Sequence, residues 1–330
     1  MHRFIPWFAA ITLLLLAPAA AEPITLKLSH FLGPSSFFQV DFAEVWAKEL
    51  TERSKGQVKV EIFNGASPYG KVTEQASQVK AGTIDIALGL RGAEGDKFLR
   101  SSIIELPFVV PNATKGSRAL WKLNEDGTLG DEYKDYKVLA LFVHNPGLVH
   151  TKNKRIVLPA DLQGVRLRAP NNTVAVALTE IGAVPAVLQV NDVMPAVRDG
   201  KIDGIVTNWG NPLQGFNDLM KFHTDIQFYT SAFFVVMNKE KYASLPDEAR
   251  HALDMISGEA LVDRFAAWWD KWDAPVRDGA KQPDHEVIVP DAAALAKWRE
   301  ALQPVTDRYL AELAGKGFSN SRAAYDKLAN

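Results

Sequence analysis

The sequence predicts an α/β protein of two similar lobes, each a mainly parallel sheet flanked by helices. One motif occurs twice: residues 79–88 and 197–206 each read as the end of a helix, a glycine, and a short apolar strand. The spacing of the two copies matches the size of one compact lobe. Each copy runs into a turn rich in glycine and polar residues, and ligands of open α/β sheets bind at such carboxyl ends of strands. Two lobes that present these edges to each other would form a cleft.

The first lobe is expected to alternate strands with helices. Strands at 24–29 and 58–63 enclose a helix, and the first copy of the motif adds a further helix and strand. This βαβαβ order produces parallel strands with right-handed crossovers. Residues 103–108 predict a buried turn before a helix around Trp121, and 138–143 predict a strand that leads toward the second lobe.

The second lobe is expected to repeat this plan. Residues 164–170 predict a strand that ends at a proline, 173–181 a helix, and 184–188 another strand. A helix around 193–197 leads into the second copy of the motif. The apolar strand at 233–238 is expected to return to the first lobe.

A long helix is predicted after this strand. It begins near Pro246, where proline and two acidic residues favour a helix start, and an apolar stripe continues from 253 to 272 without a strong break before Pro275. Extended to about Lys281, one kinked helix would be on the order of 50 Å long and would lie across both lobes. Two helices that meet at Pro275 are the alternative, because an interior proline breaks helices.

The first residues predict a secretory signal peptide. His2 and Arg3 precede an apolar run, and 19–21 fits the small-residue rule for cleavage after Ala21. A membrane anchor is the alternative, but the apolar run is shorter than the roughly 20 residues of a spanning helix.

The absence of cysteine excludes a lipid-anchored cysteine, disulfides and thiolate sites, and indicates a periplasmic protein. We therefore expect a signal peptide at 1–21, a first lobe of 22–145 plus about 235–265, and a second lobe of 146–234 plus about 266–330.

Composition and missing motifs narrow the function. The chain has 330 residues, of which 47% are hydrophobic, which suffices for two lobes with cores of their own. Its 37 Lys and Arg nearly balance 39 Asp and Glu, so it offers no electrostatic platform for nucleic acid or anionic lipid. The seven histidines are scattered, and no serine-hydrolase, Walker, dinucleotide-binding or zinc-protease motif is present. We expect no metal, no cofactor and no catalysis.

Several segments together resemble one protein family. They are Leu-Lys-Leu-Ser-His at 26–30, Ala-Gly-Thr-Ile-Asp-Ile at 81–86, Glu-Leu-Pro-Phe at 105–108, and Asp-Leu-Gln-Gly-Val-Arg-Leu-Arg-Ala-Pro at 161–170. In this order the chain resembles the substrate-binding proteins of the tripartite ATP-independent periplasmic (TRAP) transporters, DctP family. The resemblance covers nearly the whole chain after the signal peptide. It implies a two-lobed, periplasmic-binding-protein-like fold in which a long helix spans both lobes.

The resemblance also implies a carboxylate anchor. In the family, an arginine just before the proline of the last segment forms a salt bridge with the substrate carboxylate, and that position is Arg168 here. A guanidinium suits this role because it offers two parallel donors and stays charged when desolvated. Arg166 shares a face with Arg168 if the strand is regular, and we expect it to form an ion pair within the protein instead.

Other candidate site residues surround the predicted cleft. The family places a polar helper after the second copy of the motif, where Thr207 and Asn208 stand, and Trp209 could either stack on a ligand or pack in the core. The segment 145–149 lacks the second arginine of sialic-acid-binding members, which argues against that ligand. Aromatic residues near the cleft hint at an apolar or aromatic carboxylate. The candidate ligand-binding residues are Arg168, Asn208, Trp209, Thr207, Arg91, His30, Phe31, Asn145 and Phe233.

The sequence therefore predicts a periplasmic receptor that captures a small organic acid between its lobes and delivers it to the small and large membrane subunits of a TRAP transporter. A binding protein of an ATP-driven importer is one alternative, although such proteins usually join their lobes by strands and not by a long helix. A periplasmic ligand sensor is another, and a secreted hydrolase is a remote third. Neither nucleic acid nor membrane insertion after signal cleavage is expected.

Overall fold

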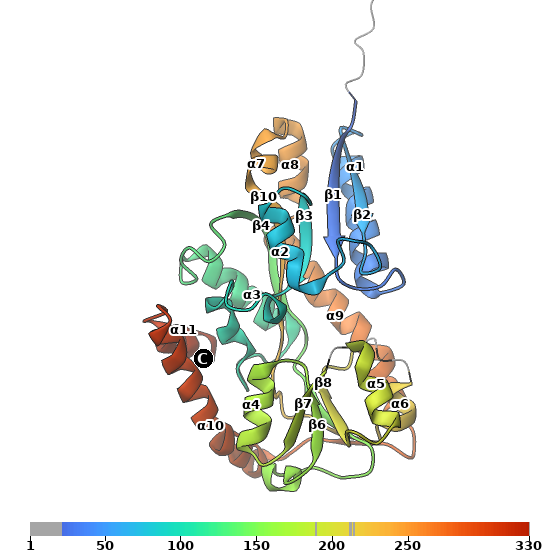
Figure 1. Ribbon diagram of the computed structural model, residues 1–330, viewed down its shortest axis with the longest axis vertical. Helices are drawn as coiled ribbons and strands as arrows, with labels where there is room; N and C mark the ends of the chain where they lie inside the picture. The colour runs from blue at the N-terminus through green and yellow to red at the C-terminus, as the bar shows by residue number, and fades with distance from the viewer. Residues whose placement is uncertain (1–21, 189, 211–212, 214, 330) are drawn as a thin grey trace, which may run out of the picture.

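The computed structural model describes residues 22–188, 190–210, 213 and 215–329. The predicted signal peptide at 1–21 lies outside this part of the chain. Two sheets organise the fold, one in each lobe (Figure 1). No helix of the described part is long and apolar enough to cross a membrane.

The first-lobe sheet has the strand order β2-β1-β3-β10-β4. β1 pairs in parallel with β2 and β3, as the βαβαβ order predicts, whereas β10 pairs antiparallel with β3 and β4. The apolar strand after the second lobe therefore does return to the first. The strands of this sheet are β1 (Ile24–His30), β2 (Val58–Phe63), β3 (Ile86–Leu90), β4 (Tyr136–Val143) and β10 (Ala232–Asn238). Its helices are α1 (Glu44–Arg53), α2 (Gln75–Lys80), α3 (Ala113–Glu125), α7 (Lys239–Ser244) and α8 (Asp247–Met255), with shorter helical turns η1 (Phe38–Ala43), η2 (Val72–Glu74), η3 (Arg91–Ala93) and η4 (Arg100–Glu105).

The second-lobe sheet has the order β11-β9-β5-β8-β6-β7. β6 pairs in parallel with β7 and β8, and β5 pairs antiparallel with β8 and β9. The strands are β5 (Leu148–Thr151), β6 (Arg166–Ala169), β7 (Val184–Val187), β8 (Gly204–Thr207), β9 (Phe222–Thr224) and β11 (Glu286–Ile288). The helices are α4 (Asn172–Glu180), α5 (Val190–Arg198) and α6 (Phe216–Leu219), with the turn η5 (Pro159–Leu162).

The repeated motif has the same structural role in both lobes. In the first, the Asp85 N–H donates to the Lys27 carbonyl at 3.0 Å, and the Asp85 carboxylate accepts from the Lys27 N–H at 2.8 Å. In the second, the Asp203 N–H donates to the Arg166 carbonyl at 2.7 Å, and its carboxylate accepts from the Arg166 N–H at 2.9 Å. Each aspartate thus ties the start of one strand to the neighbouring strand. This explains why an Asp recurs directly after the Gly-x-Ile turn.

The long helix differs from the prediction at both of its expected landmarks. The break falls between α8 and α9 (Glu259–Gly279), not at Pro275, which lies inside α9. Gly258 has φ of 63° and ψ of −141°, a conformation that only glycine adopts easily, and its N–H donates to the Leu139 carbonyl at 2.6 Å. The chain therefore turns at Gly258 before the helix resumes. α9 is about 30 Å long, not about 50 Å.

Two helices, not one, span the lobes (Figure 1). α9 packs Leu261 and Phe265 into the first-lobe core, and its second half reaches the second lobe, where Val276 packs. α10 (Ala292–Gly315) begins in the second-lobe core through Trp298 and ends in the first-lobe core through Leu313. α11 (Ser321–Ala329) also packs on the first lobe. The prediction that all of 266–330 belongs to the second lobe is wrong for this last part, because its apolar residues complete the core around η4 and α3.

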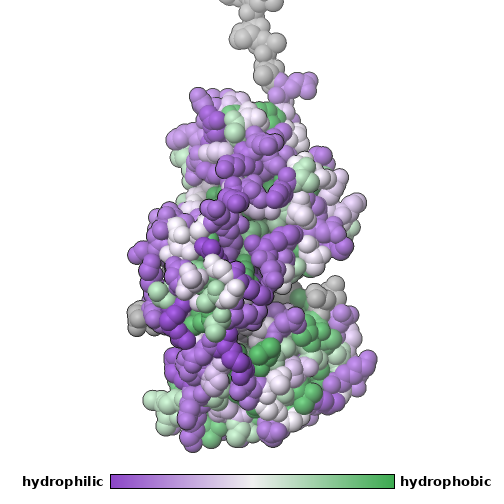
Figure 2. All heavy atoms as spheres, turned by 60° about the vertical axis from the view of Figure 1, so that its left-hand side comes forward, coloured by the Kyte–Doolittle hydropathy of each residue, from purple (hydrophilic) through white to green (hydrophobic). Residues whose placement is uncertain are grey.

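Two extended segments also join the lobes. The first links β4 to β5 through 144–147, and the second links β9 to β10 through 225–231. They run side by side, since the Gly147 N–H donates to the Tyr229 carbonyl at 2.7 Å and the Phe228 N–H donates to the Gly147 carbonyl at 2.9 Å. The outline of the molecule indents between the two halves in Figure 2. These paired segments form the hinge region between the lobes.

Candidate functional site

The arginines of β6 have different environments. Arg166 is exposed at the start of the strand, and its guanidinium pairs with Asp203, with Nε 2.9 Å from Oδ2 and Nη2 2.5 Å from Oδ1. Arg168 lies two residues closer to the carboxyl end of the strand and only 7% of its surface is exposed. An ion pair thus occupies Arg166, as expected from the sequence.

Arg168 is surrounded by main-chain carbonyls and uncharged side chains. Its Nε donates to the Leu188 carbonyl at 3.2 Å and its Nη1 to the Val206 carbonyl at 3.3 Å. Within the described part of the chain, no carboxylate lies within ion-pair distance of this guanidinium. Burial lowers the pKa of Arg168, and the Tyr229 side chain next to it only partly offsets that effect. A desolvated cation without a counterion is a site that favours an anion.

Thr207 ends β8, one residue after the Val206 carbonyl that accepts from Arg168, and Asn208 directly follows the strand. Thr207 is 5% exposed, and its side chain hydrogen-bonds the Tyr229 phenol. Asn208 is 6% exposed, and its Nδ2 donates to Asp273 Oδ1 at 3.3 Å. Tyr229 is buried, and this burial raises its pKa to about 12, so the phenol keeps its proton at neutral pH. Tyr229 comes from the hinge and was missed by the sequence reasoning.

A buried carboxylate on α9 organises the same region. Asp273 accepts hydrogen bonds from Asn208, from the N–H of Gly210 and from Nδ2 of Asn145, the last at 2.9 Å. Desolvation raises its pKa to about 6 despite these donors. Asp273 therefore connects the helix that spans the lobes with the hinge and with the loop after β8. Its only signal in the sequence is an acid on the apolar stripe of a helix.

Asn145 lies in the hinge and uses its amide within the protein. Its Oδ1 accepts from the N–H of Ala113 at 2.7 Å, and its Nδ2 also donates to Asp270 at 3.0 Å. The neighbouring residue, His144, is 4% exposed, and its Nε2 accepts from the Ser231 N–H at 3.0 Å. His144 thereby links the two hinge segments. Burial lowers its pKa to about 4, so the ring is neutral.

The first-lobe candidates are held by partners in the fold. His30 is fully buried, its Nε2 hydrogen-bonds Gln39 at 2.8 Å, and its Nδ1 accepts from the Leu32 N–H at 3.3 Å. Phe31 is partly buried against the first-lobe core. These contacts favour the structural alternative for His30, in which hydrogen bonds and not a ligand explain the histidine.

Arg91 is buried and forms an ion pair with Glu105. The Arg91 Nε lies 3.3 Å from Oε1 and its Nη2 lies 2.6 Å from Oε2 of that carboxylate. Glu105 also accepts from the N–H of Ala232 at 2.9 Å, so the pair fixes η3 against β10. Attraction to Glu105 outweighs desolvation and raises the pKa of Arg91. Its charge is therefore already balanced within the first lobe.

The two predicted aromatic contacts differ in setting. Phe233 on β10 is 6% exposed and stacks on Phe142 with centroids 5.1 Å apart. It also lies 6.2 Å from the His144 ring in the hinge. Trp209 is 6% exposed, and its ring packs on His150 and His223 with centroids 5.0 and 4.9 Å away. Core packing, the alternative left open by the sequence, accounts for these Trp209 contacts.

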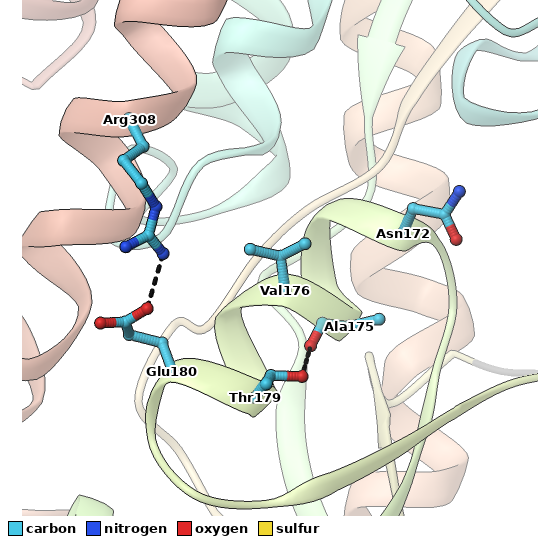
Figure 3. Close-up of a pocket in the computed structure, with 6 residues that line it drawn as sticks. All are labelled: Asn172, Ala175, Val176, Thr179, Glu180 and Arg308. Carbon is cyan, nitrogen blue, oxygen red and sulfur yellow. Dashed lines mark hydrogen bonds and ion pairs between the residues drawn. The ribbon is translucent and has the colours of Figure 1, made fainter.

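A shallow surface pocket lies elsewhere, between α4 and α10 (Figure 3). It has a volume of about 330 Å³ and is lined by Asn172, Ala175, Val176, Thr179, Glu180 and Arg308. Figure 3 shows Arg308 facing Glu180, and their closest N–O distance is 2.6 Å. Its two charged groups neutralise each other, and none of its residues is among the predicted site residues.

Comparison with known proteins decides the family. The model of the bacterial extracellular solute-binding protein family 7, named DctP, matches residues 28–313. The chain belongs to this family. The C4-dicarboxylate-binding periplasmic protein DctP of Rhodobacter capsulatus is 25% identical over 331 residues, which cover 96% of this chain and 95% of that protein. The chain is thus a TRAP solute-binding receptor of the DctP family, and this Rhodobacter relative is a periplasmic binding protein.

Two solved structures share the fold of this DctP-family receptor over almost its full length. A TRAP solute-binding protein from a marine metagenome, specific for aromatic acid ligands and crystallised with 3-hydroxybenzoate, is 30% identical with a TM-score of 0.85 over 94% of this chain and 99% of that chain. A TRAP solute-binding protein of Rhodoferax ferrireducens, in complex with copurified benzoate, is 29% identical with a TM-score of 0.84 over 93% and 96% of the two chains. The two-lobed α/β fold predicted from the sequence is confirmed.

Proposed function

We propose that this receptor captures a small aromatic monocarboxylate between its lobes and that Arg168 binds the carboxylate. The observation that carries the proposal is the Arg168 guanidinium, which is 7% exposed and, among the described residues, donates to two main-chain carbonyls and has no carboxylate partner. A carboxylate would supply the counterion and accept two parallel N–H donors.

The groups around Arg168 support a carboxylate that carries an apolar body. The phenol of Tyr229 and the hydroxyl of Thr207 are uncharged and lie on the β8 side of the guanidinium. His144 is neutral and its ring contacts Tyr229, Phe233 and Trp269. These neighbours offer hydrogen bonds to one carboxylate and ring surfaces to an aromatic group, but no second cation for a dicarboxylate. The benzoate and 3-hydroxybenzoate complexes of the two similar receptors support the same ligand class.

The remaining sequence predictions join this proposal. Thr207 and Asn208 act as polar neighbours of the ligand, while Arg91, His30, Phe31, Asn145, Trp209 and Phe233 hold the walls in place through the contacts described above. The receptor catalyses no reaction, is exported after cleavage of the signal peptide, and delivers its ligand to the two membrane subunits of a TRAP transporter. Family membership favours this role over a binding protein of an ATP-driven importer.

Calorimetry with matched ligands tests the proposal. Benzoate and 3-hydroxybenzoate are titrated into the purified receptor, with benzamide as a ligand that keeps the ring but lacks the charge, and succinate as a dicarboxylate. We expect the two aromatic acids to bind and benzamide to fail. A thermal-shift screen extends the test, because ligand at 100 times its dissociation constant adds about 2.7 kcal/mol to the free energy of unfolding. Binding of neutral sugars with no response to any carboxylate would show that the proposal is wrong.

Delivery requires a separate experiment. The receptor is added to vesicles that contain the small and large membrane subunits of a TRAP transporter from the same organism, and uptake of labelled benzoate is measured. Uptake that depends on the receptor supports transport. Binding without uptake would favour the alternative of a periplasmic ligand sensor.

A further inference from the structure

Three histidines form a continuous hydrogen-bonded row beneath the end of β8. His150 on β5 and His223 on β9 are paired residues of adjacent strands, and His285 directly precedes β11. His150 Nδ1 lies 2.8 Å from His223 Nδ1, and His223 Nε2 lies 3.1 Å from His285 Nδ1. His150 and His223 are fully buried, and the side chain of His285 has no exposed surface. We call this row the histidine ladder.

The ends of the ladder have different chemistry. At the inner end, His150 Nε2 lies 3.1 Å from the carbonyl oxygen of Thr207. At the outer end, His285 Nε2 lies 3.1 Å from Lys221 Nζ, and Lys221 forms an ion pair with Asp284 at 2.8 Å. Among the described residues, Lys221 and Asp284 are the charged groups against the ladder, and the main chain of Asn217 also lies within hydrogen-bond reach of the His285 ring. The rings of Trp209 and Phe216 cover the inner half of the ladder.

These ends determine the tautomer of every ring while the rings are neutral. A carbonyl oxygen can only accept, so His150 carries its proton on Nε2 and its Nδ1 is an acceptor. His223 must then donate from Nδ1, which leaves its Nε2 to accept from the Nδ1 proton of His285. The Nε2 of His285 then accepts from the ammonium of Lys221, which also donates to the Asn217 carbonyl at 3.3 Å. In this one arrangement every donor faces an acceptor. Each group donates to the next one along the row, from Lys221 through the three rings to the Thr207 carbonyl.

We propose that the histidine ladder positions the carboxyl end of β8 beside Arg168 by donating a hydrogen bond from His150 to the Thr207 carbonyl. Thr207 is the residue whose side chain bonds Tyr229 next to the guanidinium, and the preceding carbonyl on β8, that of Val206, accepts from Arg168 itself. A shift of this strand end would move the Val206 carbonyl and the Thr207 side chain away from the positions that hold Arg168 and Tyr229. His150 is thus a positioning residue, and His223 and His285 fix its tautomer.

The single tautomer arrangement holds only while the row is neutral. One extra proton on any ring turns an acceptor into a donor, so two donors would face each other in a buried site, or the charge would pass along the row to His150. Burial lowers the pKa of all three rings, and that of His223 to about 4, which agrees with a neutral row at neutral pH. The three rings lie in a row and do not converge on one point, and no group of three potential metal ligands occurs in the described part of the chain.

A spectroscopic experiment tests the tautomers directly. Proton–nitrogen correlation spectra are recorded at neutral pH on the receptor purified from the periplasm with isotope-labelled histidine, and ring signals are assigned with single His→Gln variants. We expect the proton on Nε2 of His150 and on Nδ1 of His223 and His285. A proton on Nε2 of His223 would overturn the proposal. This readout needs no ligand.

A matched pair of variants tests the positioning. In His150→Gln the side-chain amide nitrogen replaces Nε2 as donor to Thr207, whereas His150→Leu offers no donor; both lose the bond to His223. We expect amide exchange over 204–208 to be faster in the Leu variant only, and benzoate binding to weaken about tenfold in it and less than about threefold in the Gln variant. His251→Gln, at an exposed position on α8, is the control for loss of a histidine.

The benzoate measurement rests on the proposed function, whereas the tautomer and amide-exchange measurements do not. The outcomes therefore separate this inference from the proposed function. Equal exchange in the Gln and Leu variants would refute the positioning role, even if Arg168 binds carboxylates. If wild-type receptor binds no benzoate, the proposed function fails, and the tautomers and amide exchange still decide the ladder. If the Leu variant does not fold, retained protection in His150→Gln together with the tautomers supports the ladder, and lost protection in His150→Gln refutes it.

Discussion

Replacement of Arg168 by Ala should nearly abolish ligand binding and leave the ligand-free fold close to unchanged. The fold loses two hydrogen bonds to carbonyls, at 3.2 and 3.3 Å, but it also loses a buried charge that has no counterion in the described part of the chain. The first effect costs about 1–3 kcal/mol and the second offsets part of it. We therefore expect the free energy of unfolding without ligand to change by less than about 2 kcal/mol.

The effect on binding should be much larger. Without Arg168 the ligand carboxylate enters a desolvated site with no cation, and loss of one partner of such a buried pair costs about 2–5 kcal/mol. This corresponds to about 30-fold to several thousand-fold weaker binding. Arg168→Lys keeps the charge but loses the planar pair of donors, so it should weaken binding nearly as much.

Arg166→Ala is the matched control on the same strand. Its guanidinium already pairs with Asp203, and both side chains are more than 40% exposed, so this pair contributes only about 0–1 kcal/mol. We expect benzoate affinity to change by less than about tenfold. The assay is calorimetry on all three variants and the wild type, with urea unfolding as a check on the fold. Intact binding by Arg168→Ala would refute the assignment of this site to a carboxylate, and equal losses at Arg166 and Arg168 would indicate a shared clamp.

Three further changes test other parts of the structure. Asp273→Ala removes the buried acceptor shared by Asn145, Asn208 and the Gly210 N–H, so we expect a loss of about 2–4 kcal/mol in the free energy of unfolding measured with urea, whereas exposed Asp270→Ala should change it little. Gly258→Ala forces a side chain into a conformation with φ of 63° and should cost about 1–3 kcal/mol, and an unchanged melting temperature would contradict the helix break there. The pKa of His144 falls from an ordinary 6.5 to about 4, so the unfolded chain binds more protons below pH 6.5 and stability should fall toward pH 4. Between pH 6.5 and pH 4 the free energy of unfolding of the wild type should fall more than that of His144→Gln, as measured by urea unfolding. Glu132 and Asp273, whose pKa values are raised, have the opposite effect on stability, but both residues are present in both proteins, so their effect cancels in the comparison.

The repeat, the parallel pairing within the βαβαβ unit and the two-lobed fold could be predicted because local rules determine them. The Gly-x-Ile-Asp turn recurs because Asp85 and Asp203 each bond the neighbouring strand. The helix break could not be predicted from apolar periodicity, since the stripe continues through Gly258 while the backbone turns there. Pro275 was overestimated as a break because α9 tolerates it inside the helix.

The site was predictable only in part, because charge balance depends on contacts that are remote in the sequence. Asp273 reaches the end of β8 from α9, Tyr229 from the hinge, and the histidine ladder through His150 on β5, and no local sequence pattern connects them. The partners of the first-lobe candidates His30 and Arg91 also could not be identified from a local sequence pattern. Glu105 lies 14 residues after Arg91, yet nothing in that spacing indicates a buried pair.

Arg91 and Arg168 show what the structure adds. Arg91 directly follows β3, and Arg168 lies near the end of β6, so both stand at the predicted cleft. Arg91 is 6% exposed and Arg168 is 7% exposed. The Glu105 carboxylate raises the pKa of Arg91, whereas burial among carbonyls lowers that of Arg168. The cost of desolvating Arg91 is therefore offset within the fold, whereas no carboxylate of residues 22–188, 190–210, 213 and 215–329 offsets that of Arg168. This difference in charge balance is the reason that we propose Arg168, and not Arg91, as the residue that binds the ligand carboxylate.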